Sequence, residues 1–201
     1  MNKIKIKYYD KNIILIYKPI GVEVLNLLKF KIKNELPNKG ILNRLDKYTS
    51  GIILIARNLY FYFFYKKMLI KNYIKKKYVS ISIKKIKKGF INLNILKKKK
   101  NIINKFGKKS LTFYKILKKR KNNSILYIYI KTGRTHQIRN HFLHCKLNII
   151  NDFYNDKINK FLNTLHYKKI SFFYPFFKKN FILSCNIPIE MKKIFLIFFL
   201  K

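Results

Sequence analysis

Residues Gly40–Arg57 read G-I-L-N-R-L-D-K-Y-T-S-G-I-I-L-I-A-R. One carboxylate in this stretch, Asp46, has Arg44 and Lys47 as close neighbours. The whole chain holds 7 acidic residues against 47 lysines and arginines, so a carboxylate with a cation on each side is uncommon here. An opposite charge nearby favours the ionised form of a carboxyl group, which predicts that Asp46 is an anion at neutral pH. Taken alone, the pattern fits either a functional carboxylate or a turn with a structural ion pair.

The local geometry of this stretch follows from its residue types. If the segment is extended, the side chains of Arg44 and Asp46 lie on the same face, because residues two apart share a face in a strand. Small and polar residues favour turns, so Thr49-Ser50-Gly51 is expected to turn the chain into the apolar run that follows.

The composition describes a folded and strongly basic chain. Its 201 residues suit one domain covering residues 1–201, and a hydrophobic content of 49% allows a substantial core. The net charge of +40 favours a polyanion as partner, because lysines that neutralise phosphates release condensed counterions. The excess of Lys, Asn, Ile, Phe and Tyr is also what A/T-rich codons encode, so the charge supports RNA binding without deciding it.

Arginine is the more informative cation in this lysine-rich background. Three of the five arginines, Arg44, Arg134 and Arg139, lie in compact polar motifs. A planar guanidinium there can hold a carboxylate or a phosphate through two bonds, which a lysine cannot do.

The cysteines and the chain ends bear on location. Cys145 and Cys185 are isolated, which is typical of a reduced intracellular protein, and we expect a cytoplasmic one. Residues 1–9 alternate lysine with isoleucine and lack the apolar run of a secretory signal. The apolar run at residues 194–200 is far shorter than the roughly 20 residues that span a bilayer, so no membrane association is expected.

The order of strand and helix signals predicts an α+β fold with a mixed, mostly antiparallel central sheet flanked by a few helices. Strands are expected at residues 3–9, 13–17, 75–83, 111–117, 124–130, 165–173 and 181–186, with 84–110 as an irregular excursion and 148–152 as a short strand or a turn. Helices are expected at residues 24–28, at 58–72 and from Pro188, as first helical residue, to the C-terminus. In the 58–72 helix the pattern points to a packed face of Leu59, Tyr62, Phe63, Lys66, Leu69 and Ile70.

The segment Lys18-Pro19-Ile20-Gly21 follows the first predicted hairpin. Proline fixes φ and glycine permits a tight bend, so Lys18 could be displayed at a strand end. Among so many lysines, the simplest interpretation of Lys18 alone is a solvent-exposed side chain.

A second polar cluster, K-T-G-R-T-H-Q-I-R-N-H-F-L-H, occupies residues 131–144. Gly133 can turn the chain out of the preceding strand, and Thr135 is expected to be the N-cap of a helix that runs to about Cys145. Free backbone N–H groups at such a helix start can hold an anion. Three histidines and Cys145 crowd together here, but acidic ligands are scarce and no zinc spacing is present, so no metal is expected.

Four blocks in a fixed order carry a family resemblance. They are I-I-L-I-Y-K-P-I-G-V at residues 13–22, N-R-L-D-K-Y-T-S-G at 43–51, K-K-Y-V-S-I at 76–81 and T-G-R-T-H-Q-I-R at 132–139. With weaker matches at residues 148–152 and 164–172, they make the chain resemble the RluA-type pseudouridine synthases from residue 8 to its end. The resemblance implies the catalytic domain of that family, acting as an isomerase on RNA uridines without a cofactor.

The resemblance also implies roles for the residues in these blocks. Asp46 would attack the target uridine covalently while the base detaches, rotates and rejoins the ribose through carbon 5. Tyr78 would stack on the flipped uracil and help to move protons, and Arg139 would keep Asp46 ionised. Arg44 would help to extrude the nucleotide. The residues expected to contact RNA are Arg44, Arg134, Lys18, Lys47 and His136.

Some positions depart from the family pattern. Asn43 stands where histidine usually precedes R-L-D, and Tyr48 stands where an acidic or small polar residue is common. Asn148 and Asn151 replace a neighbourhood usually occupied by proline or glycine. We expect no N-terminal S4 RNA-binding module, so the grip on RNA would come from the catalytic domain's own basic surface.

The sequence therefore predicts a monomeric RNA pseudouridine synthase, with large-subunit ribosomal RNA as the expected substrate. Transfer RNA is the alternative within the family. A basic RNA-binding or ribosome-assembly protein without catalysis is the alternative outside it, although such a protein would not need Asp46, Tyr78 and Arg139 together.

Overall fold

The computed structural model describes residues 5–27, 36–84, 86–98, 101–147, 149–150 and 164–200. Its strands are β1 (Lys5–Tyr9), β2 (Ile13–Lys18), β3 (Ser50–Ala56), β4 (Lys75–Ser82), β5 (Gly89–Asn92), β6 (Ile95–Leu96), β7 (Ile102–Ile103), β8 (Leu111–Arg120), β9 (Asn123–Ile130), β10 (His166–Tyr174) and β11 (Lys179–Ser184). Its helices are α1 (Val24–Leu27), α2 (Leu59–Ile70), α3 (Gln137–His144) and α4 (Ile189–Leu200), with 3-10 turns at Pro37–Gly40 and Pro175–Phe177.

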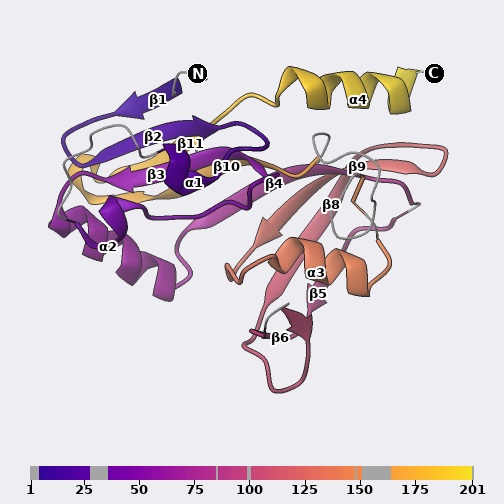
Figure 1. Cartoon of the computed structure of the whole chain (residues 1–201), viewed down its shortest axis with the longest axis horizontal. Helices are drawn as coiled ribbons and strands as arrows, with labels where there is room; N and C mark the ends of the chain where they lie inside the picture. Colours follow the sequence, from indigo (N-terminus) through magenta and orange to yellow (C-terminus); the bar gives the residue numbers. More distant parts are fainter. Residues whose placement is uncertain are drawn as a thin grey trace.

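One large mixed sheet organises the molecule (Figure 1). The strands run in the order β1-β2-β3-β10-β4-β9-β8-β5, with β11 also paired to β10, while β6 and β7 form a separate ribbon. Neighbouring strands are antiparallel throughout the described sheet except for β10 and β3, which pair in parallel. The predicted α+β fold with a mostly antiparallel sheet is confirmed.

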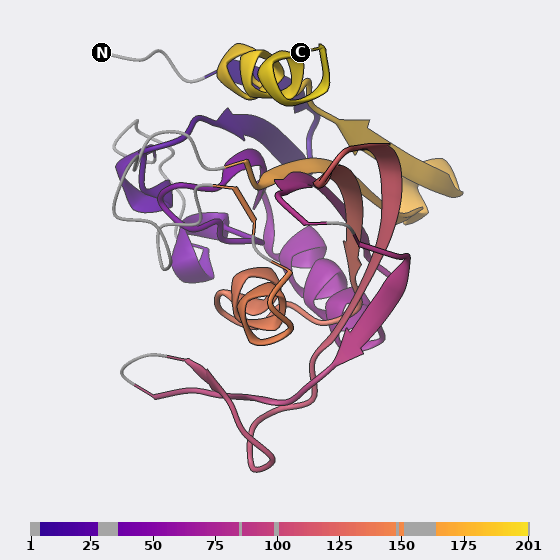
Figure 2. The same ribbon diagram turned by 90° about the vertical axis from the view of Figure 1, so that its right-hand side faces the viewer.

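The helices divide between the two faces of the sheet. Figures 1 and 2 show α2 and α3 on one face and α4 on the other. Successive side chains of β4 point to opposite faces of the sheet, so this one strand packs against the helices on both faces. Tyr78 packs into the core under α2 and α3, whereas Val79 and Ile81 pack with Met191 and Ile194 of α4.

The predicted strands are confirmed with small changes at their ends. The hairpins of β1 with β2 and of β8 with β9 form as expected, and β10 begins at His166. The predicted excursion at residues 84–110 contains β5, β6 and β7. Of the predicted strand or turn at 148–152, only Ile149 and Ile150 lie within the described residues, and Ile149 bridges Ser82 of β4.

The predicted packed face of α2 is only partly right: Tyr62 is buried and Leu69 packs against the core as expected. The helix buries Phe61, Tyr62, Tyr65 and Met68. Of the residues expected to pack, Leu59, Phe63 and Ile70 are exposed. The helix carries apolar residues on every side, so their spacing alone does not identify which face is buried. The Asn58 side chain, which accepts a hydrogen bond from the Phe61 backbone N–H at 2.8 Å, caps the helix start.

Two predicted helix starts are also corrected. The N-cap of α3 is His136, in the left-handed conformation with φ 54°, and no side chain caps the helix, so Thr135 does not have its predicted role. Helix α4 begins at Ile189, because the carbonyl of Pro188 accepts a hydrogen bond from the Lys192 N–H and so lies one position before the first turn.

None of the helices in the described ranges is long and apolar enough to cross a membrane.

Candidate active site

The loop that carries Asp46 is held to the sheet by its own neighbours. The Asn43 side chain donates to the carbonyl of Ile52 at 2.9 Å and accepts from the N–H of Leu54 at 2.8 Å, so it bridges the loop to β3. The Thr49 N–H donates to the carbonyl of Asp46 at 3.0 Å and closes a tight turn. This turn lies earlier than predicted, because β3 already begins at Ser50.

Lys18 supports this loop from below, and the expectation of a solvent-exposed lysine is wrong. Its side chain is fully buried. The ammonium donates to three backbone carbonyls: Pro19 at 2.9 Å, Val22 at 2.7 Å and Lys47 at 2.8 Å. Burial lowers the pKa of Lys18 to about 8, although the negative charge of Asp46 acts in the opposite direction. These contacts tie the end of β2 to the Asp46 loop and do not favour the predicted contact of Lys18 with RNA.

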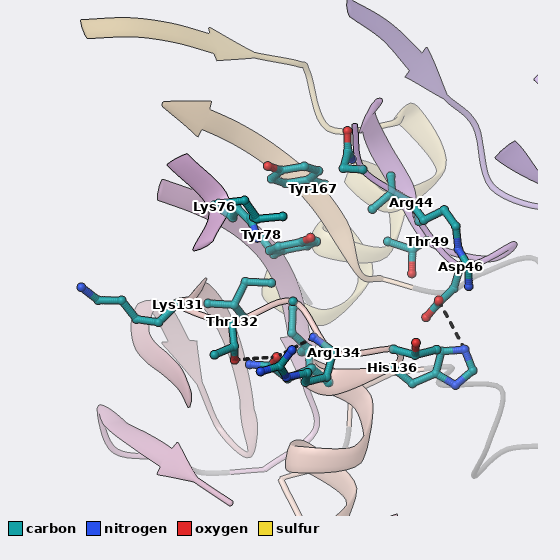
Figure 3. A pocket seen from close by; sticks show the side chains of 18 of the residues that line it. Arg44, Asp46, Thr49, Lys76, Tyr78, Lys131, Thr132, Arg134, His136 and Tyr167 are labelled. Carbon is teal, nitrogen blue, oxygen red and sulfur yellow. Dashed lines mark hydrogen bonds and ion pairs between the residues drawn. The ribbon is translucent and has the colours of Figure 1, made fainter. Parts of the chain in front are cut away.

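Helix α3 and its N-cap supply the partners of Asp46, and Figure 3 shows the contact with the N-cap His136. Arg139 Nη1 lies 3.4 Å from one carboxylate oxygen, and His136 Nε2 lies 3.3 Å from the other. Burial raises the pKa of Asp46, but His136 and Arg139 together outweigh it, so the net pKa lies below the ordinary value. The two sequence blocks thus meet as predicted, and the carboxylate is an anion at neutral pH.

The loop before α3 owes its shape to Gln137, which is buried. Its side-chain oxygen accepts from the hydroxyl of Thr132 at 2.8 Å and from the N–H of Arg134 at 3.0 Å. Its amide donates to the Leu111 carbonyl and the Thr112 hydroxyl, both at 3.1 Å. These four bonds fold residues 132–137 over β8, which brings His136 to Asp46.

Tyr78 stands beside Asp46 and is backed by a second tyrosine. The rings of Tyr78 and Tyr167 are stacked, with centroids 4.5 Å apart and planes at 13°. Burial and the charge of Asp46 raise the pKa of Tyr78 far above its ordinary value, so its hydroxyl keeps its proton. Tyr167 covers one face of the Tyr78 ring, which leaves the other face for the cavity described next (Figure 3).

The junction of β3 with β10 sets the position of Tyr167. The strands pair through Ser50 opposite His166 and Gly51 opposite Tyr167. The Ser50 hydroxyl lies 2.8 Å from Nδ1 of His166. A Cβ at Gly51, where φ is +129°, would lie 2.4 Å from the backbone oxygen of Tyr167. Only glycine therefore permits this approach.

A cavity of about 690 Å³ opens next to Asp46 and Tyr78. Its walls come from the Asp46 loop, α2, β4, and the 131–139 segment. A second hollow lies against Asp46 as well, lined by residues 23–25, 44–48, His136 and Arg139. Arg44, Lys47 and Arg134 are exposed around these openings. The other predicted site residues lie at Asp46 or in the cavity wall, except Lys18, which is buried and lines neither opening.

Two residues of the site were missed from the sequence, Lys76 and Tyr167. Both line the cavity and both are buried. Lys76 precedes Tyr78 by two positions in β4, a spacing that places it on the same face. That spacing is the signal that could have identified it.

The histidines near α3 do not form a metal site. His141 Nε2 lies 3.0 Å from the Leu93 carbonyl, and Cys145 is exposed. Within the part of the chain that the structure describes, no group of three or more potential metal ligands occurs.

Comparisons with known proteins agree with this geometry. A family model described as RNA pseudouridylate synthase matches residues 12–144. The ribosomal large subunit pseudouridine synthase D of Buchnera aphidicola subsp. Schizaphis graminum is 34% identical over 94% of this chain and 71% of its own length. The enzyme of the same name from Buchnera aphidicola subsp. Acyrthosiphon pisum is 34% identical over 73% of this chain and 53% of its own length. The solved structure of human RNA pseudouridylate synthase domain containing 4 superposes with a TM-score of 0.75 at 18% identity, covering 94% of this chain and 90% of that one, a likeness of fold.

Proposed function

Because the chain belongs to the RNA pseudouridylate synthase family, we propose that it isomerises uridine in RNA to pseudouridine. The observation that carries the proposal is the setting of Asp46. It is an anion held by His136 and Arg139 at the edge of a cavity whose wall contains Tyr78. A fixed, ionised carboxylate beside an aromatic wall suits a nucleophile that attacks a nucleoside held on that wall.

The reaction is an isomerisation and needs no redox partner. The bond from the ribose to N1 of uracil breaks, and a bond from the ribose to C5 forms. The proton on C5 leaves, and N1 gains a proton, so the atoms of substrate and product balance. Asp46 would carry the covalent attack, and no cofactor would take part.

Tyr78 and Arg139 would assist in different ways. Tyr78 would stack on the flipped uracil with its uncovered face, and its protonated hydroxyl can donate to a group that gains charge. Arg139 would hold Asp46 in its ionised form and fix the direction of its oxygens. His136, predicted as an RNA contact, lies on the other carboxylate oxygen and would share this task.

Arg44, Lys47 and Arg134 would contact the RNA around the openings. Their exposed cations can hold phosphates, and Arg44 could occupy the space that the extruded nucleotide leaves. We place the substrate in large-subunit ribosomal RNA, since the bacterial relatives carry that substrate in their names. The protein would act as a monomeric, single catalytic domain in the cytoplasm.

The test is release of tritium from RNA labelled at C5 of uridine. With an unmodified large-subunit ribosomal RNA transcript, we expect release by the wild type and a loss of at least about 1,000-fold in Asp46→Asn, because that variant lacks the nucleophile. Glu190→Gln, a carboxylate change on α4 across the sheet, is the control and should react like the wild type. Absence of release by the wild type from both ribosomal and transfer RNA would leave the non-catalytic binding protein as the better account, and release from transfer RNA alone would reassign the substrate.

A further inference from the structure

Lys76 is a buried cation that the proposed reaction has not used. Its side chain lines the cavity beside Tyr78, and the residue is only 7% exposed. Within the described residues its ammonium has no hydrogen-bond acceptor and no carboxylate partner, in contrast to Arg139. Burial, and then the positive charge of Arg134, lower the pKa of Lys76 to about 8, so it still carries its proton at neutral pH.

The described residues around Lys76 screen its ammonium from much of the solvent without offering an acceptor, and the group keeps contact only with the cavity that it lines. Such partial desolvation of a cation is costly. The charge of Arg134 nearby adds repulsion to this cost. A group that the fold itself does not satisfy, aimed into a cavity, is a candidate for binding a ligand. The ligand atom must be an acceptor, since an ammonium group can only donate.

The position of Lys76 relative to Asp46 narrows the choice of ligand atom. Figure 3 shows Lys76 and Asp46 on either side of the Tyr78 ring. The Lys76 ammonium lies near the start of the 131–144 cluster, 3.2 Å from where a Cβ of Gly133 would stand. Asp46, on the separate 43–51 loop, contacts residues farther along the 131–144 cluster, His136 and Arg139.

We propose that the Lys76 ammonium binds the carbonyl oxygen at the end of the flipped uracil that is farthest from the ribose. The inference rests on the proposed function, in which the ribose carbon lies at Asp46 and the base lies on Tyr78. In uracil the ring atom opposite N1 is C4, which carries O4. That oxygen points away from the ribose, toward the Lys76 end of the cavity.

The same contact serves the product. When uracil turns so that C5 faces the ribose, the ring atom opposite C5 is C2, which carries O2. Lys76 therefore meets a carbonyl oxygen before and after the rotation. Cytosine carries an amino group on C4, which is a donor and leaves the ammonium without an acceptor. Lys76 thus selects uracil over cytosine, since a site built to hydrogen-bond one group strongly rejects a base that lacks it.

A phosphate is the other acceptor that a lysine commonly binds. The phosphates of the target nucleotide leave from the ribose, at the Asp46 end. Arg44 and Lys47 are exposed there. Arg134, whose charge acts on Lys76, is also exposed and open to a phosphate, whereas Lys76 itself is buried. The geometry favours the base, and the salt dependence of binding separates the two.

The first experiment compares Lys76→Met with the wild type. On the C5-tritiated ribosomal RNA transcript, single-turnover release should fall by about 10- to 100-fold, the range for one hydrogen bond to a charged group. The slope of log affinity against log salt should stay unchanged, whereas loss of a phosphate contact would reduce it by about 0.7 to 0.9. Lys77→Met is the matched control, because Lys77 is the next residue of β4 and points to the opposite face.

The second experiment pairs the enzyme change with a change of one atom in the RNA. Transcripts containing 4-thiouridine carry sulfur, a weaker acceptor, in place of O4. Release by the wild type and by Lys77→Met should fall by about 5- to 10-fold, and release by Lys76→Met should change little further, because the contact is already absent. Equal losses in all three proteins would overturn the proposal.

The outcomes separate this inference from the proposed function. Wild-type protein that releases no tritium refutes the proposed function. Wild-type protein that reacts together with an equally active Lys76→Met refutes the role of Lys76 alone, as does a reduced salt slope in that variant. Lys76→Leu provides a second apolar variant should Lys76→Met fail to fold.

Discussion

Lys18 and Lys76 are two buried lysines at one site, Lys18 under the Asp46 loop and Lys76 beside Gly133, and they differ in what surrounds their ammonium groups. Lys18 is fully buried and Lys76 is 7% exposed. Burial lowers the pKa of each to about 8. Lys18 donates to three backbone carbonyls, whereas no acceptor within the described residues contacts Lys76. The fold therefore satisfies the hydrogen-bond donors of Lys18 but offers no acceptor to those of Lys76 within the described residues.

The presence or absence of hydrogen-bond acceptors distinguishes a cation that supports the fold from one that is available to bind a ligand. A buried charge that is fully hydrogen-bonded holds the backbone that carries its acceptors. A buried charge without acceptors contributes a cost to the fold and a donor to the cavity. In a chain with 47 lysines and arginines, net charge cannot make this distinction, but hydrogen bonding can.

The largest effect on stability is expected from Lys18→Met. The change leaves the carbonyls of Pro19, Val22 and Lys47 without their donor and should reduce the free energy of unfolding by about 3–5 kcal/mol. Lys76→Met, which removes an unpaired charge, should leave the free energy unchanged or raise it by about 1 kcal/mol. Urea unfolding of both variants measures the difference. Equal destabilisation would mean that both lysines are structural.

A smaller effect on stability is expected from Gly51→Ala, where β3 packs closely against Tyr167 of β10. The new Cβ would lie 2.4 Å from the backbone oxygen of Tyr167 and 2.7 Å from its Cβ, at a φ that alanine rarely adopts. We expect a loss of about 2–3 kcal/mol, and a change in the near-ultraviolet circular dichroism as Tyr167 shifts on Tyr78.

Gly133→Ala is the matched change on the side of Lys76. Its Cβ would meet only the flexible end of the Lys76 side chain, at 3.2 Å. The free energy of unfolding should therefore change by less than about 1 kcal/mol. If Gly133→Ala destabilised the protein as much as Gly51→Ala, Lys76 would be held as firmly as Tyr167, and the contrast between the two sides would fail.

Much of this arrangement could be predicted from the sequence. Alternating apolar residues identified the strands, because sheet position repeats every two residues. The two polar blocks identified Asp46 and Arg139, which the structure brings within 3.4 Å. Asn43, which departs from the family pattern, hydrogen-bonds to the backbone of β3 and so ties the Asp46 loop to that strand.

The rest depends on contacts between distant segments. The burial of Lys18 follows from carbonyls that converge after the chain has folded, and no local pattern encodes it. The stacking of Tyr167 on Tyr78 requires β10 to insert between β3 and β4. The face of α2 was partly mistaken because aromatic side chains surround the helix, so tertiary packing decided which of them to bury.

A pH dependence of similarly small size is expected from Lys76. Its folded-state pKa of about 8 lies below the ordinary value of 10.5. Below about pH 8 both states bind the proton and the full cost of the buried charge is present; between about pH 8 and pH 10 the unfolded state binds more protons, so stability rises with pH. Relative to Lys76→Met, the wild type should therefore gain about 1 kcal/mol between about pH 7 and pH 9, since one pKa unit corresponds to about 1.4 kcal/mol. The difference between the two unfolding free energies measures this gain, because all other titrating groups are shared. A difference that stays constant over this range would mean that the Lys76 ammonium is as well solvated in the folded protein as in the unfolded chain, and that it is not the unsatisfied donor that distinguishes it from Lys18.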